Sequence, residues 1–120
     1  MAKKVSEANT LTKHCLKALS LKGFNVWRQN NGGVYDAKIK AYRANSSTPG
    51  VPDIIGYRKS DGVFIGVEIK VGKDKLSMAQ DAFLKGIIKA GGIAFTISSI
   101  EEIENKIYNM DQDGYNYPDF

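Results

Sequence analysis

Three charged residues stand at the outer ends of two apolar, β-branched runs in the middle of the chain. The segment GVPDIIGYRKSDGVFIGVEIKVGKDK (50–75) carries Asp53 at the start of the first run, and Glu68 and Lys70 at the end of the second. Two carboxylates and an amine held close together can bind a divalent cation and a water molecule beside a phosphodiester. The alternative is a solvated sheet edge with a weak ion pair, which Glu-x-Lys alone favours. Asp53 shifts the balance towards a site, because it follows Pro52 where no capping role is evident.

The turn between the two runs decides whether these charges share a face. An Asp-Gly dipeptide at 61–62 predicts a two-residue hairpin loop, which would place Asp53 opposite Lys70 and Ile55 opposite Glu68. Directly opposed residues share a face, as do residues two apart on one strand, so all three charges would project together. A loop of three residues would instead place Asp53 and Glu68 on opposite faces.

The other face of the predicted hairpin is apolar and is expected to join the core. It consists of Ile54, Gly56, Val63, Ile65, Val67 and Ile69. Gly66 falls on the charged face, where the absence of a side chain would leave room for a close approach.

Other elements must carry this hairpin. Apolar periodicity predicts helices over 6–22, 77–90 and 98–109, and strands over 24–30, 53–59, 63–70 and 93–97. The segment 34–50 begins as a strand or as part of a hairpin and ends as a loop. The order of elements predicts an α/β fold, with a mixed central sheet flanked by helices. We expect one domain over residues 1–120, with an acidic and aromatic tail over 110–120.

Composition limits the chemistry further. A single cysteine, Cys15, and a single histidine, His14, exclude an internal disulfide framework and multi-histidine zinc sites, so a metal would be held by oxygen, as magnesium and manganese are. No segment approaches the roughly 18 apolar residues of a membrane span, and the N-terminus lacks the apolar stretch of a secretory signal, so a cytoplasmic location is expected.

The charge of the chain is unevenly distributed. The net charge is +4, and the last ten residues contain three aspartates and no basic residue, which leaves +7 (4 plus 3) on residues 1–110. Such a bias favours contact with a polyanion, and ordinary solubility charge is the alternative.

The chain resembles the VRR-NUC family of the PD-(D/E)xK nuclease superfamily. The resemblance rests on the Pro-Asp and Glu-x-Lys motifs, the hairpin between them, the glutamate of the first helix and the SMAQ sequence of the next helix. The resemblance covers Glu7 to about Ile100. It implies a restriction-endonuclease-like αβββαβ core, which agrees with the order of elements predicted above. It also implies a DNA endonuclease that depends on Mg²⁺ or Mn²⁺ and prefers branched or junction DNA. Stand-alone members resemble Holliday-junction resolvases, so a homodimer is expected, and the phage-like size would place the protein in a host cytoplasm.

The resemblance also implies roles for the charged residues. Asp53 and Glu68 would be metal-binding carboxylates, with the Ile69 carbonyl as a third ligand. Lys70 would orient or deprotonate the attacking water, or stabilise the charge that develops on the phosphate.

Two further residues match the family pattern and also have plainer roles. Glu7 matches a glutamate that reaches the metal, often through water, but a glutamate in a first turn also suits the helix dipole. Gln80 matches a glutamine beside the scissile phosphate, yet it lies three residues after Ser77 and could complete a capping box. The two roles of Gln80 do not exclude each other.

A set of basic residues is expected to track the nucleic-acid backbone, with a solvated surface as the alternative. It comprises Arg28, Lys38, Lys40, Arg43, Lys73 and Lys75. Trp27 beside Arg28 suits nucleic-acid contact, although a core position is the more common role of tryptophan.

Two functions from other classes stay open on sequence grounds. One is a non-catalytic nucleic-acid-binding module on the same fold, against which the intact Asp53, Glu68 and Lys70 argue. The other is a metal-independent RNA-binding protein, which would keep its affinity in EDTA and prefer ribose.

Overall fold

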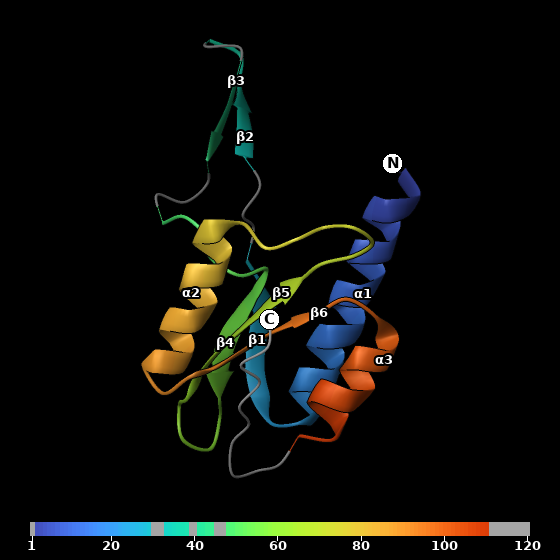
Figure 1. The fold of residues 1–120 in the computed structure, drawn as a ribbon, viewed down its shortest axis with the longest axis vertical. Helices are drawn as coiled ribbons and strands as arrows, with labels where there is room; N and C mark the ends of the chain where they lie inside the picture. Colours follow the sequence, from blue (N-terminus) through green and yellow to red (C-terminus); the bar gives the residue numbers. More distant parts are fainter. Residues whose placement is uncertain (1, 30–32, 39–40, 45–47, 111–120) are drawn as a thin grey trace.

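The computed structural model describes residues 2–29, 33–38, 41–44 and 48–110. The chain forms helices on both faces of a four-stranded sheet, with a separate two-stranded ribbon (Figure 1). In chain order the elements are α1 (Ala2–Leu21), β1 (Phe24–Arg28), β2 (Gly33–Asp36), β3 (Ala41–Ala44), β4 (Ile54–Arg58), β5 (Phe64–Ile69), α2 (Met78–Lys89), β6 (Ile93–Ile97), α3 (Ile100–Ile103) and a π-helical turn, η1 (Glu104–Tyr108). Apart from the ribbon, this is the predicted order, and the fold is restriction-endonuclease-like.

The main sheet has the strand order β1-β4-β5-β6. The first three strands pair antiparallel, and β5 pairs parallel with β6 through the crossover helix α2. Helices α1 and α3 cover one face of the sheet and α2 covers the other (Figure 1). The mixed sheet flanked by helices that the sequence predicts is therefore confirmed.

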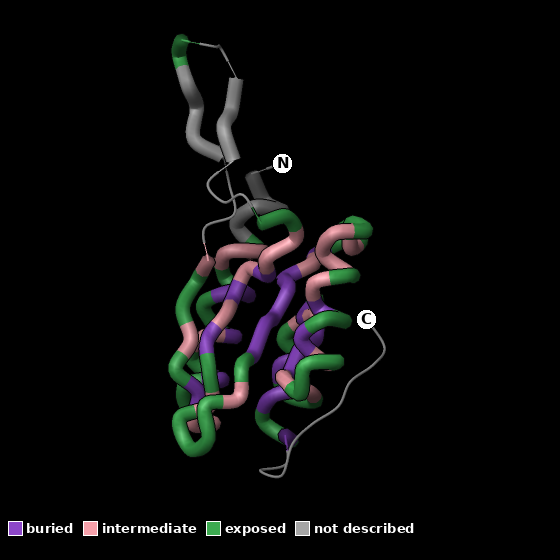
Figure 2. Tube along the Cα trace, turned by 90° about the vertical axis from the view of Figure 1, so that its left-hand side faces the viewer, coloured by how far each residue is buried: buried purple, intermediate pink, exposed green. Residues whose placement is uncertain are grey.

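The larger part of the core lies between α1 and the sheet. Leu11, Cys15, Ala18 and Leu19 are buried on one side of α1, at the helical spacing seen in the sequence. They pack against buried strand residues, which include Phe24, Ile54, Ile65, Val67, Phe95 and Ile97. Each fully buried Leu, Ile or Phe contributes about 1.5–3 kcal/mol to folding, so this face anchors the sheet firmly. Figure 2 shows the buried positions along the strands and the inner helix faces.

The β4–β5 hairpin has a register that differs from the predicted one. Ile54 pairs with Val67 and Tyr57 pairs with Phe64, so the predicted pairing of Asp53 with Lys70 is wrong by two residues. The turn has four residues rather than two, because the Arg58 N–H donates to the Val63 carbonyl at 2.8 Å.

Side chains of the turn explain its size. The guanidinium of Arg58 donates to Asp61, with Nε at 2.9 Å from Oδ1, and the same Oδ1 accepts the Val63 N–H at 3.1 Å. Gly62 adopts a φ of +80°, which favours glycine. These contacts stabilise the wider turn against the tight Asp-Gly turn.

The shift of two residues preserves the faces of the strands. Ile54, Ile65, Val67 and Ile69 are buried towards α1, as predicted. The prediction that Gly66 leaves room for an approaching ligand is wrong, because a Cβ at that position would lie 2.7 Å from Cδ1 of Ile87 on α2. The space at Gly66 is filled by the helix.

The segment for which the sequence left two possibilities forms a hairpin of its own. β2 and β3 pair antiparallel, with Tyr35 opposite Tyr42 and Val34 opposite Arg43. This ribbon stands away from the body of the molecule (Figure 1).

Candidate active site

The observed register brings the two predicted carboxylates together. Asp53 immediately precedes β4, and continuing the pairing of Ile54 with Val67 by one step puts Asp53 opposite Glu68. The side-chain Oδ2 of Asp53 accepts the Ile69 N–H at 2.8 Å, and its backbone carbonyl accepts the Gln29 N–H at 2.6 Å. Asp53 is thus fixed between β1 and β5, with its carboxylate at the end of β5.

Glu68 is an acidic side chain in a buried position. Its exposed fraction is 1%, and among the described residues its Oε2 is a buried side-chain oxygen without a hydrogen-bond partner. Burial is the main cause that raises the pKa of Glu68 to about 9. A hydrogen bond with the Asp53 side chain and the negative charge of Asp53 raise this pKa further, whereas the positive charge of Lys70 lowers it. This raised pKa favours the protonated form of Glu68 at neutral pH.

Lys70 lies two residues beyond Glu68 on the same side of the chain. Its backbone N–H donates to the Ile97 carbonyl at 3.0 Å, which extends the pairing of β5 with β6, and its side chain is half-buried. Because its charge acts on Glu68, the structure brings together the two acids and the amine that the sequence singled out.

Gln80 has the capping role that the sequence offered as one of two. Its Oε1 accepts the Ser77 N–H at 2.9 Å, and its own N–H donates to Ser77 Oγ at 3.1 Å. The loop that leads to Asp53 passes this end of α2, since a Cβ on Gly50 would lie 2.2 Å from the Ala79 carbonyl oxygen. The second role of Gln80, beside a phosphate, stays a prediction.

Glu7 lies at the same end of the sheet but is not grouped with the acid pair. It is exposed and lines a hollow of about 440 Å³ beyond the ends of β5 and β6, together with Val71 and Ser98. In the described part of the chain, no three His, Cys, Asp or Glu side chains are close enough to hold a metal ion together. A water-mediated role for Glu7 and ligation by the Ile69 carbonyl therefore stay predictions.

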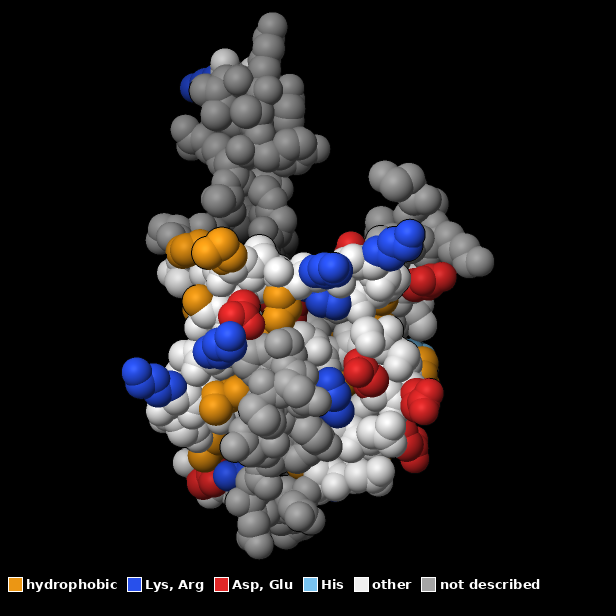
Figure 3. All heavy atoms as spheres, in the orientation of Figure 1, with side chains coloured by type: hydrophobic (Ala, Val, Ile, Leu, Met, Phe, Trp, Pro, Cys, Tyr) orange, Lys and Arg blue, Asp and Glu red, His pale blue; other side chains and the backbone are white. Residues whose placement is uncertain are grey.

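The other basic residues lie in different surroundings. Lys73 and Lys75 are exposed in the loop between β5 and α2, and Lys38 is exposed beyond the end of β2. Arg28, at the end of β1, donates from Nη2 to Asn9 of α1 at 2.9 Å. Arg43 belongs to β3, and Lys40 lies outside the described residues. In Figure 3 several Lys and Arg side chains lie along the end of the body from which the ribbon rises.

Aromatic side chains extend the face that carries the acid pair. Trp27, Tyr57 and Phe64 have exposed fractions of 45%, 40% and 40%, so the core position considered for Trp27 is wrong. The sequence interpretation did not single out Tyr57 or Phe64. Their even spacing from Asp53 and Glu68 is the signal that places them on this face.

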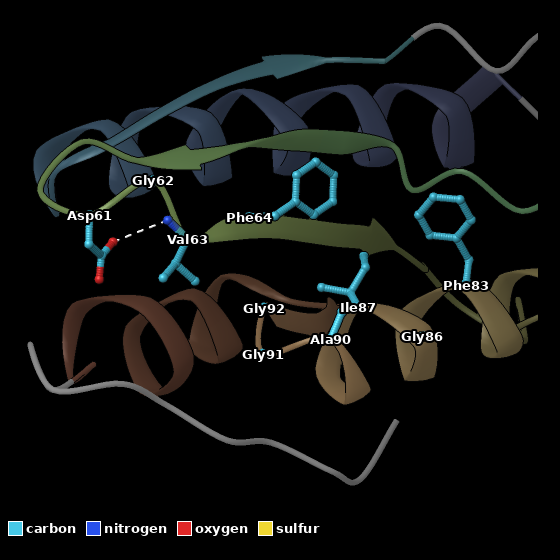
Figure 4. A pocket seen from close by; sticks show the side chains of 10 residues that line it. All are labelled: Asp61, Gly62, Val63, Phe64, Phe83, Gly86, Ile87, Ala90, Gly91 and Gly92. Atoms are coloured by element: carbon cyan, nitrogen blue, oxygen red, sulfur yellow. Dashed lines mark hydrogen bonds between the residues drawn. The ribbon is translucent and has the colours of Figure 1, made fainter.

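A second hollow lies at the opposite end of the sheet. It has a volume of about 660 Å³ between the β4–β5 turn and the last turns of α2, with Phe64, Phe83 and Ile87 on its walls (Figure 4). Its one carboxylate, Asp61, is engaged by Arg58 and by the Val63 N–H, and the hydrogen bond from Arg58 is the main cause that lowers its pKa. This apolar hollow offers no group for hydrolysis.

The remaining reactive side chains do not compete with the acid pair. Cys15 is fully buried, and burial raises the pKa of its thiol to about 12, so it is a packing residue rather than a nucleophile. His14 is exposed on α1.

Comparison with known proteins supplies the context for this site. The VRR-NUC domain family model matches residues 10–99, which include both carboxylates and Lys70. The curated proteins contain no match to the chain. Among the described residues, no helix is long and apolar enough to cross a membrane. VRR-NUC domains are nuclease domains of the PD-(D/E)xK kind. With its matched length, its mixed sheet and its paired acids, the chain belongs to the VRR-NUC family.

Proposed function

We propose that this nuclease domain is a metal-dependent DNA endonuclease whose reaction takes place at Asp53, Glu68 and Lys70. The observation that carries the proposal is the buried, unpartnered oxygen of Glu68 directly across from Asp53. Two carboxylates on opposed positions of neighbouring strands repel each other when both are ionised. A divalent cation between them would relieve this repulsion and would give Glu68 Oε2 a partner.

The donors fit Mg²⁺ or Mn²⁺. Both ions prefer oxygen ligands, and Asp53 and Glu68 offer carboxylate oxygens. When bound, such an ion supplies Lewis acidity for the phosphate and lowers the pKa of a water. The Ile69 carbonyl and Glu7, the latter through water, are the proposed additional ligands.

The side chains of the chain have separate tasks in the proposed reaction. Asp53 is held rigid by the Ile69 N–H, so its remaining carboxylate oxygen keeps a fixed direction. Glu68 would hold the cation as an anionic ligand, which requires its deprotonated form. Lys70 orients the attacking water or compensates the charge that builds up on the phosphate, and Gln80 positions the phosphate from the first turn of α2.

Other parts of the proposal depend on the family likeness. They are a preference for branched DNA or four-way junctions, a homodimer with one active site for each strand, and a cytoplasmic location. Lys73 and Lys75, exposed beside Lys70 in sequence, would contact the phosphates on either side of the cleaved bond.

A cleavage panel tests the proposal. The wild-type protein, Asp53→Asn and Lys70→Ala would be assayed on a four-way junction and on a linear duplex, in Mg²⁺, Mn²⁺ or EDTA. We expect cleavage only by the wild-type protein and only with metal. Equal cleavage by all three proteins would refute the assigned residues, and binding without cleavage by the wild type would favour the non-catalytic module.

A further inference from the structure

The ribbon formed by β2 and β3 lies outside the proposed active site. Its two strands pair with each other and form a sheet separate from the main one. A two-stranded hairpin that stands alone is only marginally stable in water. A ribbon that stands away from the body is therefore expected to gain order from a partner (Figure 1).

Both ends of the ribbon are anchored beside the acid pair. On one side, Gln29 bonds to the backbone of Asp53 four residues before β2 begins at Gly33. On the other side, the chain returns through Gly50, which packs against the first turn of α2. The ribbon thus rises from the end of the sheet that carries Asp53 and Glu68, and whatever it binds must lie next to that pair.

The sequence of the ribbon is basic. Residues 33–44 contain Lys38, Lys40 and Arg43 against one acid, Asp36, for a net charge of +2. Without Lys40, which lies outside the described residues, the described part still has more basic than acidic residues. The cross-strand pairs are Tyr35 with Tyr42 and Val34 with Arg43. This charge fits a polyanion rather than another basic protein surface.

We infer that the ribbon is a DNA-binding arm that enters the major groove of the duplex flanking the cleaved bond. The inference rests on the proposed function, because it takes DNA as the substrate. The major groove is about 12 Å wide and admits a two-stranded β-ribbon. The nine Cα–Cα steps from Gln29 to Lys38 span at most about 30 Å, which is close to one helical turn of DNA. The arm therefore selects for duplex next to the scissile phosphate, with Lys38 and Arg43 as its phosphate contacts.

Binding measured in EDTA tests the arm without any cleavage. Fluorescence anisotropy with a labelled duplex of about three helical turns would compare the wild type with Lys38→Gln/Arg43→Gln over a range of salt concentrations. Each phosphate contact contributes about 0.9 to the slope of log affinity against log salt, so we expect the slope to fall by about 1.8 for the two. Affinity near 0.1 M salt should fall on the order of tenfold or more.

A matched control removes two exposed charges at the opposite end of the sheet. Lys59→Gln/Lys89→Gln changes the β4–β5 turn and the last turn of α2, and should leave the slope close to the wild-type value. A second arm variant replaces residues 34–43 with two glycines. It should lose the same affinity for duplex while its thermal unfolding temperature stays near that of the wild type, since the main sheet and its core do not include the ribbon.

Two results would overturn the inference. One is an unchanged salt slope and affinity in the Lys38→Gln/Arg43→Gln protein. The other is a changed sedimentation coefficient of the Lys38→Gln/Arg43→Gln protein together with an unchanged slope of log affinity against log salt. That result would identify a second copy of the chain as the partner of the ribbon. An Asp53→Asn protein that still cleaves would contradict the proposed function instead, and would leave the binding result intact.

Discussion

The carboxylate of Asp53 accepts the backbone N–H of Ile69 at 2.8 Å, across from the end of β5. This bond fixes the first acid by means of the residue that follows the second, Glu68. Rotation of Asp53 away from the pair would leave the Ile69 N–H without its acceptor, at a cost of about 1–3 kcal/mol. The acid pair is thus built into the hairpin rather than formed by flexible side chains.

The buried Glu68 should make the stability of the metal-free protein depend on pH. Its folded-state pKa of about 9 lies above the ordinary value of 4.5, so the folded state binds more protons between these values. In EDTA, the contribution of Glu68 to the free energy of unfolding should be highest below pH 4.5. It should fall by at most about 1.4 kcal/mol per pH unit up to about pH 9.

Denaturant unfolding at several pH values would measure this dependence. Glu68→Gln should flatten the profile and stabilise the protein at neutral pH. Glu101→Gln, which changes an exposed acid in the first turn of α3, should keep the wild-type profile. A profile that is the same in the wild type and Glu68→Gln would contradict the assignment of the buried proton.

Metal should stabilise the folded protein through the same pair. Mn²⁺ at about 100 times its dissociation constant should add about 2.7 kcal/mol to the free energy of unfolding, because the unfolded chain does not hold the two acids together. Thermal unfolding with and without Mn²⁺ would show this gain in the wild type and in Glu101→Gln, and its loss in Asp53→Asn. Titration calorimetry in buffers of different ionisation enthalpy should detect the proton released from Glu68.

Lys70 should affect the reaction and not the binding of metal. Lys70→Ala should lower the cleavage rate by roughly 10²–10³-fold, as the loss of one charge-stabilising donor does in other active sites. The stabilisation by Mn²⁺ should stay within error of the wild type, and Lys89→Ala on α2 serves as the control. Loss of metal-induced stabilisation in Lys70→Ala would show that its role is to hold the acid pair in place.

The two roles of Gln80 can be separated with a substitution that keeps the cap. Gln80→Glu retains an acceptor for the Ser77 N–H, since glutamate also serves at this position of a capping box. Stability should be unchanged and cleavage should fall, because a negative charge would face the phosphate. Ser77→Ala should do the opposite, with a loss of about 1 kcal/mol of stability and normal cleavage under native conditions. Full activity of Gln80→Glu would leave Gln80 with the capping role alone.

The close packing at Gly66 predicts a destabilising substitution with a specific rescue. Gly66→Ala places a methyl group 2.7 Å from Cδ1 of Ile87 and should cost about 1–3 kcal/mol. Ile87→Val removes that Cδ1 and should recover part of the loss in the double variant, because Pro52 Cγ would still lie 3.0 Å from the added methyl group; denaturant titration would measure the recovery. Additive losses in the double variant would mean that the two side chains do not compete for the same space.

The sequence predicted the fold because its periodic signals are strong, and it predicted the acid pair from the hairpin and from the family resemblance. The α1 stripe and the apolar face of β4 and β5 follow the spacing of buried residues, and the family likeness supplied the roles of Asp53 and Glu68. The hairpin register was wrong because the guanidinium of Arg58 competes for Asp61 and opens the turn, a contact that the Asp-Gly signal does not include.

Two features of the site depend on contacts between distant parts of the chain. The space beside Gly66 belongs to Ile87, which lies 21 residues further along the chain, so strand spacing alone could not reveal it. Burial of Glu68 likewise follows from the way α2 and β6 enclose β5, and a Glu-x-Lys pattern is equally compatible with an exposed edge.

The four-residue turn between β4 and β5 has a consequence for engineering. A shift of the β4–β5 pairing by two residues keeps Glu68 on the same face of the sheet, whereas a shift by one residue moves every β5 side chain to the other face. Tags or fluorophore loops grafted into this turn should therefore be checked for the register of β5 and not only for their size. An odd shift would turn Glu68 away from Asp53 from the far end of the sheet, with both residues still present in the sequence.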